Sequence, residues 1–81
     1  MNSSDALLVA NFQTFLNQDI GIGLCHSKLY AVALVKNCNL VTIEDLKDAY
    51  AQGLFNNHPS VFHLNERDFE MLKVYFAMHQ N

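Results

Sequence analysis

The stretch LYAVALV, residues 29–35, is the longest uninterrupted apolar run in the sequence and decides the fold class. Polar residues stand on both sides of it, at 26–28 and 36–37. Because a helix that is apolar on every side has to be buried, the run predicts a buried helix over residues 23–37. A short apolar run also fits a central strand. Two alanines and two leucines, against two valines, favour the helix.

The segment before this run predicts a helix over residues 4–18. Ser3 or Ser4 can cap its N-terminus, and Asp5 places negative charge in the first turn, where the helix dipole favours it. Apolar side chains then recur at the spacing of one helical face, at Leu8, Phe12, Phe15 and Leu16. The next segment, residues 19–23, contains two glycines, so we expect the helix to end there.

Two more helices are predicted from capping signals in the second half of the chain. Thr42 followed by Asp45 is a weaker form of the capping box and predicts a helix over residues 43–54, ending near Gly53. Asn65 followed by Asp68 repeats the pattern and predicts a helix over residues 66–79.

These four segments predict a single all-α domain over residues 1–81, packed as a small four-helix bundle or a compact orthogonal helical array. We expect the helices over 23–37 and 66–79 to form its centre. The apolar arc of the last helix is wider than one neighbouring helix can cover. This helix is therefore either central or buries a second face against another chain, and we expect a homodimer.

The composition restricts the function. Of the 81 residues, 51% are hydrophobic and only 16% are charged, which is the opposite of a disordered chain. Five basic residues against eight acidic ones give a net charge of -3. This balance lacks the positive charge that binding to nucleic acid or to an anionic membrane requires. We therefore expect no direct nucleic-acid partner and no membrane partner.

The two cysteines, Cys25 and Cys38, are predicted to be reduced. One helix between them would place them roughly 20 Å apart, whereas a disulfide needs Cα atoms within about 7 Å. We expect both thiols to pack as small apolar groups. Reduced cysteines, a start without a basic signal-peptide region and the lack of a membrane-length apolar run predict a soluble, cytoplasmic protein.

Patterns for catalysis or metal binding are weak in this sequence. Cys25 and His26 are neighbours, and neighbours on a helix point in different directions. His58 and His63 resemble half of a zinc pattern, but the cysteines lack the close spacing of a structural zinc site. The clustered carboxylates are explained by helix capping. We expect no enzyme activity, no metal and no cofactor.

The surplus of aromatic and apolar side chains indicates protein binding, although the same side chains are candidates for the core alone. Aromatic residues and methionine are enriched at protein interfaces, and an acidic margin suits a basic partner. The predicted partner-binding residues are Tyr50, Phe55, Phe62, Tyr75, Phe76, Met78, Glu44, Asp45, Asp48, Glu66, Asp68 and Glu70.

The function predicted from these features is that of a non-enzymatic protein-binding module. Such a module acts as an inhibitor, an immunity-type protein, an adaptor or a small chaperone. The alternative is a small transcription regulator, which binds DNA as a dimer or blocks another regulator by acidic mimicry.

Overall fold

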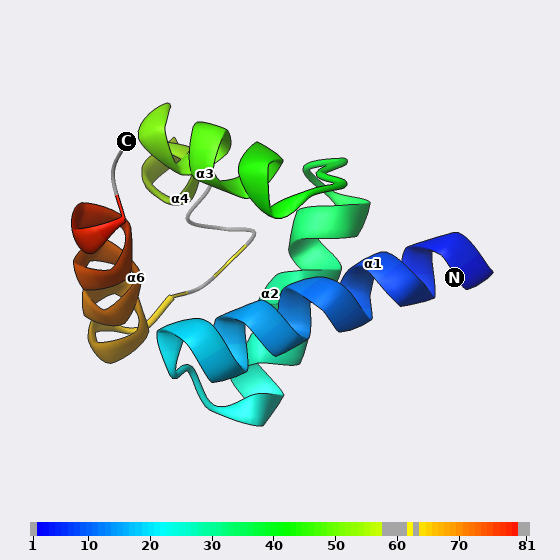
Figure 1. Ribbon diagram of the computed structural model, residues 1–81, viewed down its shortest axis with the longest axis horizontal. Coiled ribbons are helices and arrows are strands. Elements are labelled where there is room, and N and C mark those ends of the chain that lie inside the picture. Colours follow the sequence, from blue (N-terminus) through cyan, green and yellow to red (C-terminus); the bar gives the residue numbers. More distant parts are fainter. Residues whose placement is uncertain (1, 58–61, 63, 80–81) are drawn as a thin grey trace.

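The computed structural model describes residues 2–57, 62 and 64–79, and their backbone forms helices without a strand (Figure 1). In chain order the elements are α1 (Ser3–Thr14), η1 (Phe15–Ile20), α2 (Leu24–Lys36), α3 (Ile43–Ala51), α4 (Leu54–Asn57) and α6 (Glu66–Met78). The element η1 is a π-helix that continues α1. The four main helical segments lie where the sequence predicts them, and the all-α class is confirmed.

Side-chain caps begin α3 and α6, as predicted. At α3 the capping box is complete: the Asp45 N–H donates to Thr42 Oγ1 over 3.0 Å, and the Thr42 N–H donates to Asp45 Oδ2 over 3.0 Å. At α6 the Asp68 N–H donates to Asn65 Oδ1 over 2.7 Å. These bonds satisfy backbone donors that a helix start otherwise leaves open.

Two predicted boundaries differ from the structure. The N-cap of α1 is Asn2, whose side chain accepts from the Asp5 N–H over 2.8 Å, so the prediction of Ser3 or Ser4 is wrong. The helix predicted over residues 43–54 is interrupted between α3 and α4, where Gly53 has φ 88°. Because this left-handed conformation suits glycine, the chain turns there before α4 begins.

The centre of the core lies between α1, η1 and α2, which turns back across α1 (Figure 1). The radius of gyration, 11.6 Å, matches the value of about 11.7 Å expected for a folded chain of this length. Large side chains that are completely or almost completely buried come from α1, η1, α2, α3, α6 and the turn before α2: Phe12, Leu16, Ile22, Leu34, Leu46 and Leu72.

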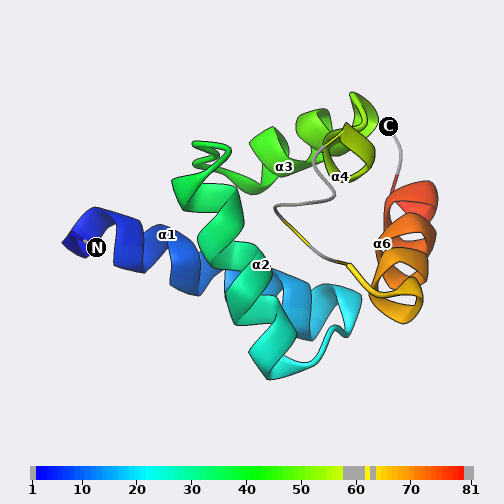
Figure 2. The same cartoon turned by 180° about the vertical axis from the view of Figure 1, so that it is seen from behind.

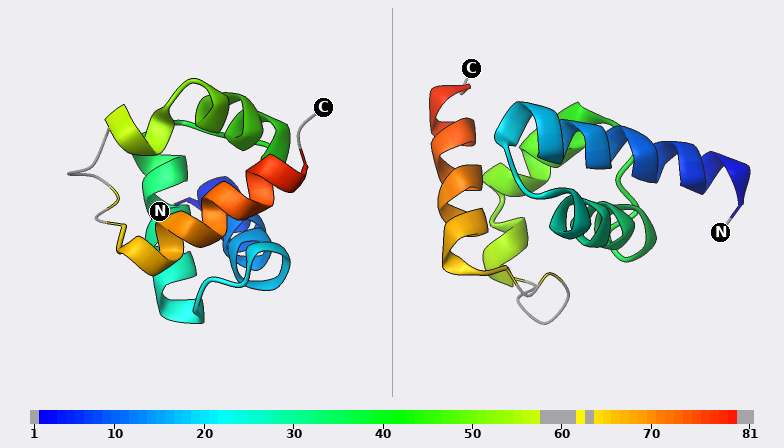
Figure 3. Two further views of the ribbon diagram at one scale, coloured as in Figure 1. Left: turned by 90° about the vertical axis from the view of Figure 1, so that its left-hand side faces the viewer. Right: turned by 90° about the horizontal axis from the view of Figure 1, so that it is seen from below.

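Of the two helices expected at the centre, one is central and the other is not. In the helix over 23–37, residues 30–35 are buried apart from the partly buried Val32, whereas Leu24 and Leu29 are 62% and 66% exposed. The last helix, α6, is not central: it runs across one end of the molecule (Figure 3). Both helices expose apolar side chains because a chain this small has too few helices to surround each of them.

The turn after η1 brings the backbone close to α6. Gly21 has φ 98°, and a Cβ built there would lie 2.9 Å from the Met71 methyl carbon. At Gly23, two residues later, a Cβ built in the same way has no atom within 4 Å, and the φ of this residue is negative. Glycine is therefore required at the first position and only tolerated at the second.

We predict that Gly21→Ala lowers the free energy of unfolding by about 1–3 kcal/mol, because alanine is strained at positive φ and meets Met71. Gly23→Ala is the matched control. There, a stiffer unfolded chain offsets a poorer N-cap, so stability changes by less than about 0.5 kcal/mol. Urea denaturation measures both values, and equal losses at the two positions would contradict the prediction.

The capping box predicts a pH-dependent stability. Backbone hydrogen bonds from Thr42 and Val41 hold the pKa of the Asp45 carboxyl below its ordinary value of 3.8. A carboxyl with a lowered folded-state pKa stabilises the fold above its ordinary pKa, and this contribution is lost as the pH falls through the folded-state pKa. Asp45→Asn should therefore lower the melting temperature at pH 7, and the difference should shrink below pH 3.8.

Asp48→Asn, on the exposed side of α3, is the control for this experiment and should leave the melting temperature nearly unchanged at both pH values. Thermal melts followed by circular dichroism give the comparison. A difference between wild type and Asp45→Asn that is the same at pH 7 and pH 2 would show that the carboxylate charge has no part in the cap.

Candidate functional site

The helix α6 faces the core along one narrow stripe. Asp68, Leu72 and Phe76 recur every four residues and are the buried residues of this helix. The Phe76 ring stacks on Tyr50 of α3, with ring centroids 4.4 Å apart. This stripe fixes the rotation of α6 and so decides which of its other side chains remain at the surface.

A second apolar stripe on α6 is only partly covered. Met71, Val74, Tyr75 and Met78 follow the spacing of one helical face. Met71 and Tyr75 pack against the core at their inner edges, whereas Val74 is 54% exposed and Met78 is 75% exposed. Neighbouring large apolar side chains that stay in water are typical of binding surfaces.

This second stripe forms one wall of a groove, and the end of η1 forms the other. The groove has a volume of about 330 Å³. We call it the α6–η1 groove and define it by its lining residues, Asp19, Ile20, Glu70, Met71, Val74, Tyr75 and Met78. Its floor and walls are mainly apolar, and its two carboxylates come from opposite walls.

The geometry of η1 sets the far wall of the groove. A π-turn places an extra residue in the helical turn and is frequent at functional sites. The turn closes when the Gly21 and Ile22 N–H groups both donate to the Leu16 carbonyl, over 3.1 and 3.0 Å. The Asn17 amide donates to the Ile22 carbonyl over 2.9 Å. This end of the helix is therefore well hydrogen-bonded, and its wall is preformed.

The groove carries negative charge at its edges. Asp19 is exposed, and no ion pair to it occurs among the described residues. Glu70 pairs with Lys73 over 2.7 Å, and this hydrogen bond raises the pKa of Lys73. Arg67, one turn earlier on α6, is not a lining residue. The negative charge of Asp19 is therefore uncompensated, whereas that of Glu70 is partly neutralised by Lys73.

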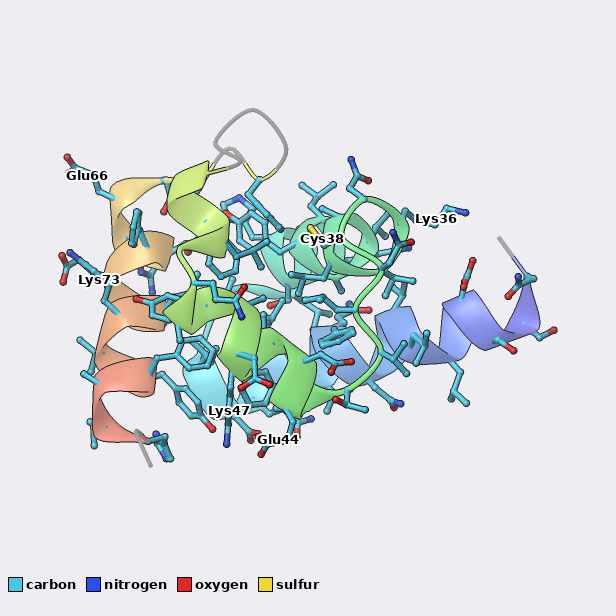
Figure 4. All side chains as sticks on the ribbon, turned by 90° about the horizontal axis from the view of Figure 1, so that it is seen from above. Lys36, Cys38, Glu44, Lys47, Glu66 and Lys73 are labelled. Carbon is cyan, nitrogen blue, oxygen red and sulfur yellow. The ribbon has the colours of Figure 1, made fainter. Side chains whose placement is uncertain are left out.

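A second hollow lies between α3 and α6 on the other side of α6. It has a volume of about 630 Å³ and is lined by Glu44, Lys47, Asp48, Tyr50, Ala51, Lys73, Phe76, Ala77 and His79. Glu44 and Lys47 lie together on α3, and Lys73 comes from α6 (Figure 4). Acids and bases are balanced there, so this hollow has no clear charge preference and no large exposed apolar side chain.

The Asp68 carboxylate is buried and hydrogen-bonded. Its Oδ2 accepts from the Tyr30 hydroxyl over 2.6 Å and from His26 Nδ1–H over 2.8 Å. Burial, the hydrogen bond and the charge of Asp68 hold the pKa of Tyr30 well above its ordinary value. None of these three residues lines either hollow. Because His26 and Tyr30 belong to α2 and Asp68 belongs to α6, their two hydrogen bonds hold the two helices together.

The predicted partner-binding residues do not form one surface in the structure. Tyr75, Met78 and Glu70 line the α6–η1 groove, and Glu44, Asp48, Tyr50 and the buried Phe76 line the α3–α6 hollow. Phe55, Phe62 and Asp68 are buried and line neither. The expectation that Asp68 belongs to an exposed acidic margin is wrong, because two donors from α2 hold it inside. Asp45 is used by the capping box, and Glu66 lies on the outside of α6 (Figure 4).

Sequence reasoning missed several groove residues. Met71 and Val74 follow the same helical spacing as Met78, so the pattern itself could have revealed them. Asp19 and Ile20 gave no such signal, because only the packing of η1 beside α6 brings them to the groove. The cysteine prediction also needs a correction: Cys25 is exposed, while Cys38 is partly buried and its burial raises the pKa of its thiol.

This chain matches no protein-family model, no curated protein and no solved structure with which it was compared. Within the described residues, no helix combines the length and apolar character needed to cross a bilayer. In the same part of the chain, no three His, Cys, Asp or Glu side chains are grouped so that they could hold a metal ion. His58 and His63 lie outside the described residues.

We predict that Tyr30→Phe lowers the free energy of unfolding by about 1.5–3 kcal/mol, because the buried Asp68 carboxylate loses a donor. Tyr75→Phe is the matched control, since no hydrogen bond to the Tyr75 hydroxyl occurs in the part of the chain that the structure describes. This variant should change stability by less than about 0.5 kcal/mol. Equal losses in urea denaturation would show that Tyr30 stabilises the fold only through its ring.

Proposed function

We propose that this protein is a protein-binding module and that its α6–η1 groove takes an apolar segment of another polypeptide. The observation that carries the proposal is the exposure of Val74 and Met78 beside a preformed, mainly apolar groove. Each side chain removed from water there contributes on the order of 1–2 kcal/mol. Met71 and Met78 have flexible side chains, which suits a surface that adapts to its ligand.

The charge of the groove selects the partner. Asp19 and Glu70 lie at its edges, and the chain as a whole carries a net charge of -3. A partner with Lys or Arg beside its apolar side chains gains favourable encounter electrostatics, whereas an acidic partner is repelled. The expected ligand is therefore an amphipathic helix with a basic margin, bound as a helix in a groove. Such binding serves an adaptor or an inhibitor equally well.

The test uses a fluorescein-labelled helical peptide of about 18 residues built from leucine and lysine, with fluorescence anisotropy as the measurement. We expect the peptide to bind the wild-type chain, and Val74→Gln and Met78→Gln to weaken binding at least tenfold each, which is about 1.4 kcal/mol. Glutamine keeps the helix propensity and adds no charge.

Leu7→Gln on α1 is the control, because Leu7 is 62% exposed but lies outside the groove. It should leave the affinity within about twofold. A counterpart peptide with glutamate in place of lysine should bind more weakly than the lysine peptide. Binding that is insensitive to both groove variants, or equal for the two peptides, would refute the proposal.

A further inference from the structure

The outer face of α2 has the chemistry that the α6–η1 groove is proposed to recognise. Cys25, Lys28, Leu29, Val32 and Lys36 follow helical spacing along one side of α2. Leu29 is 66% exposed, and Val32 is partly buried. We define these five residues as the α2 outer face. It is an amphipathic surface with an apolar centre and lysines beside it.

The charges of the two surfaces are complementary. Lys28 takes part in no ion pair among the described residues, and the same is true of Asp19 at the groove. Each copy of the chain therefore offers one uncompensated lysine beside an exposed leucine and one uncompensated carboxylate beside an exposed apolar groove. Opposite charges at the edges of two apolar surfaces favour their association and fix its orientation.

The two surfaces are of similar length. The groove is lined on α6 by residues 70–78, which span about 12 Å, and the outer face of α2 runs from Cys25 to Lys36, about 16 Å. The outer face of α2 from one copy is therefore long enough to cover the groove of another. Both surfaces expose large apolar side chains in the isolated chain, and this contact covers both at once.

One copy cannot make this contact with itself. Within one copy, α2 already presents a different side to α6, because His26 and Tyr30 hydrogen-bond to Asp68. Figure 2 shows α2 along the near side and α6 at one end, and Lys36 of the outer face lies far from α6 (Figure 4). The contact must therefore join two different surfaces of two copies. Such a heterologous contact leaves one groove and one outer face open in every dimer, so the chain can grow by further copies.

From these observations we infer that a second copy of this chain occupies the groove and that the protein associates head to tail, with the outer face of α2 in the α6–η1 groove of its neighbour. The inference rests on the proposed function of the groove. It gives the expected association of two copies a head-to-tail geometry, which differs from a symmetric homodimer, in which one surface meets the same surface of its copy.

The test is a mixing experiment read by sedimentation velocity over increasing protein concentration. Wild-type chains should form dimers and larger species. Leu29→Gln makes the apolar centre of the outer face polar, and Met78→Gln does the same to the groove. Each variant alone should therefore associate at least tenfold more weakly than the wild type. Mixed together, the two should form a one-to-one dimer and nothing larger, because each supplies the surface that the other lacks.

One substitution outside both surfaces and one pair of charge reversals complete the experiment. Leu7→Gln, exposed on α1, should associate like the wild type. Lys28→Glu should weaken association, and so should Asp19→Lys. Mixed together, these two should again form dimers and larger species in which the variants alternate, because both kinds of contact then join opposite charges. Self-association that survives Leu29→Gln but not Met78→Gln, with no dimer on mixing, would overturn the inference in favour of a symmetric contact through α6.

The inference and the proposed function can fail separately. A wild-type chain that stays monomeric at all concentrations but binds the leucine–lysine peptide through Val74 and Met78 refutes head-to-tail association and keeps the groove as a binding site. A chain that neither associates nor binds the peptide refutes both.

Discussion

The buried Asp68 carboxylate decides which side chains of α6 are exposed at the surface. A carboxylate removed from water has to be hydrogen-bonded, and here the Tyr30 hydroxyl and the His26 ring, both from α2, supply the donors. This cluster and the apolar stripe of Leu72 and Phe76 together set the rotation of α6. A turn of α6 about its axis would break the cluster, so the same bonds that bury Asp68 keep Val74 and Met78 at the surface.

The wall opposite α6 depends on backbone geometry. The π-turn of η1 and the positive φ of Gly21, which suits glycine, let the chain reverse close to the end of the Met71 side chain. The resulting groove is preformed, so a ligand does not have to order it on binding. The π-turn η1 therefore shapes one wall of the α6–η1 groove, and the Asp68 cluster orients α6, which forms the other wall.

Much of the fold was predictable because its signals are local. Thr42 with Asp45, and Asn65 with Asp68, mark helix starts through bonds that span only three residues. The break at Gly53 was predicted less well, because a glycine marks a boundary without saying whether another helical turn follows. The candidate site was predicted only in part: Tyr75 and Met78 reach the groove, while Phe55 and Phe62 are used in the core.

By itself, the sequence determined the all-α class, the order of the helices and the shortage of positive charge, since propensity, capping and net charge depend on residues near one another or on their sum. Only the tertiary structure decided which apolar side chains are covered. Leu29 and Leu34 belong to the same apolar run, yet one is exposed and the other fully buried. The reason is that burial depends on which neighbouring helix is present on each side, and no local pattern records that.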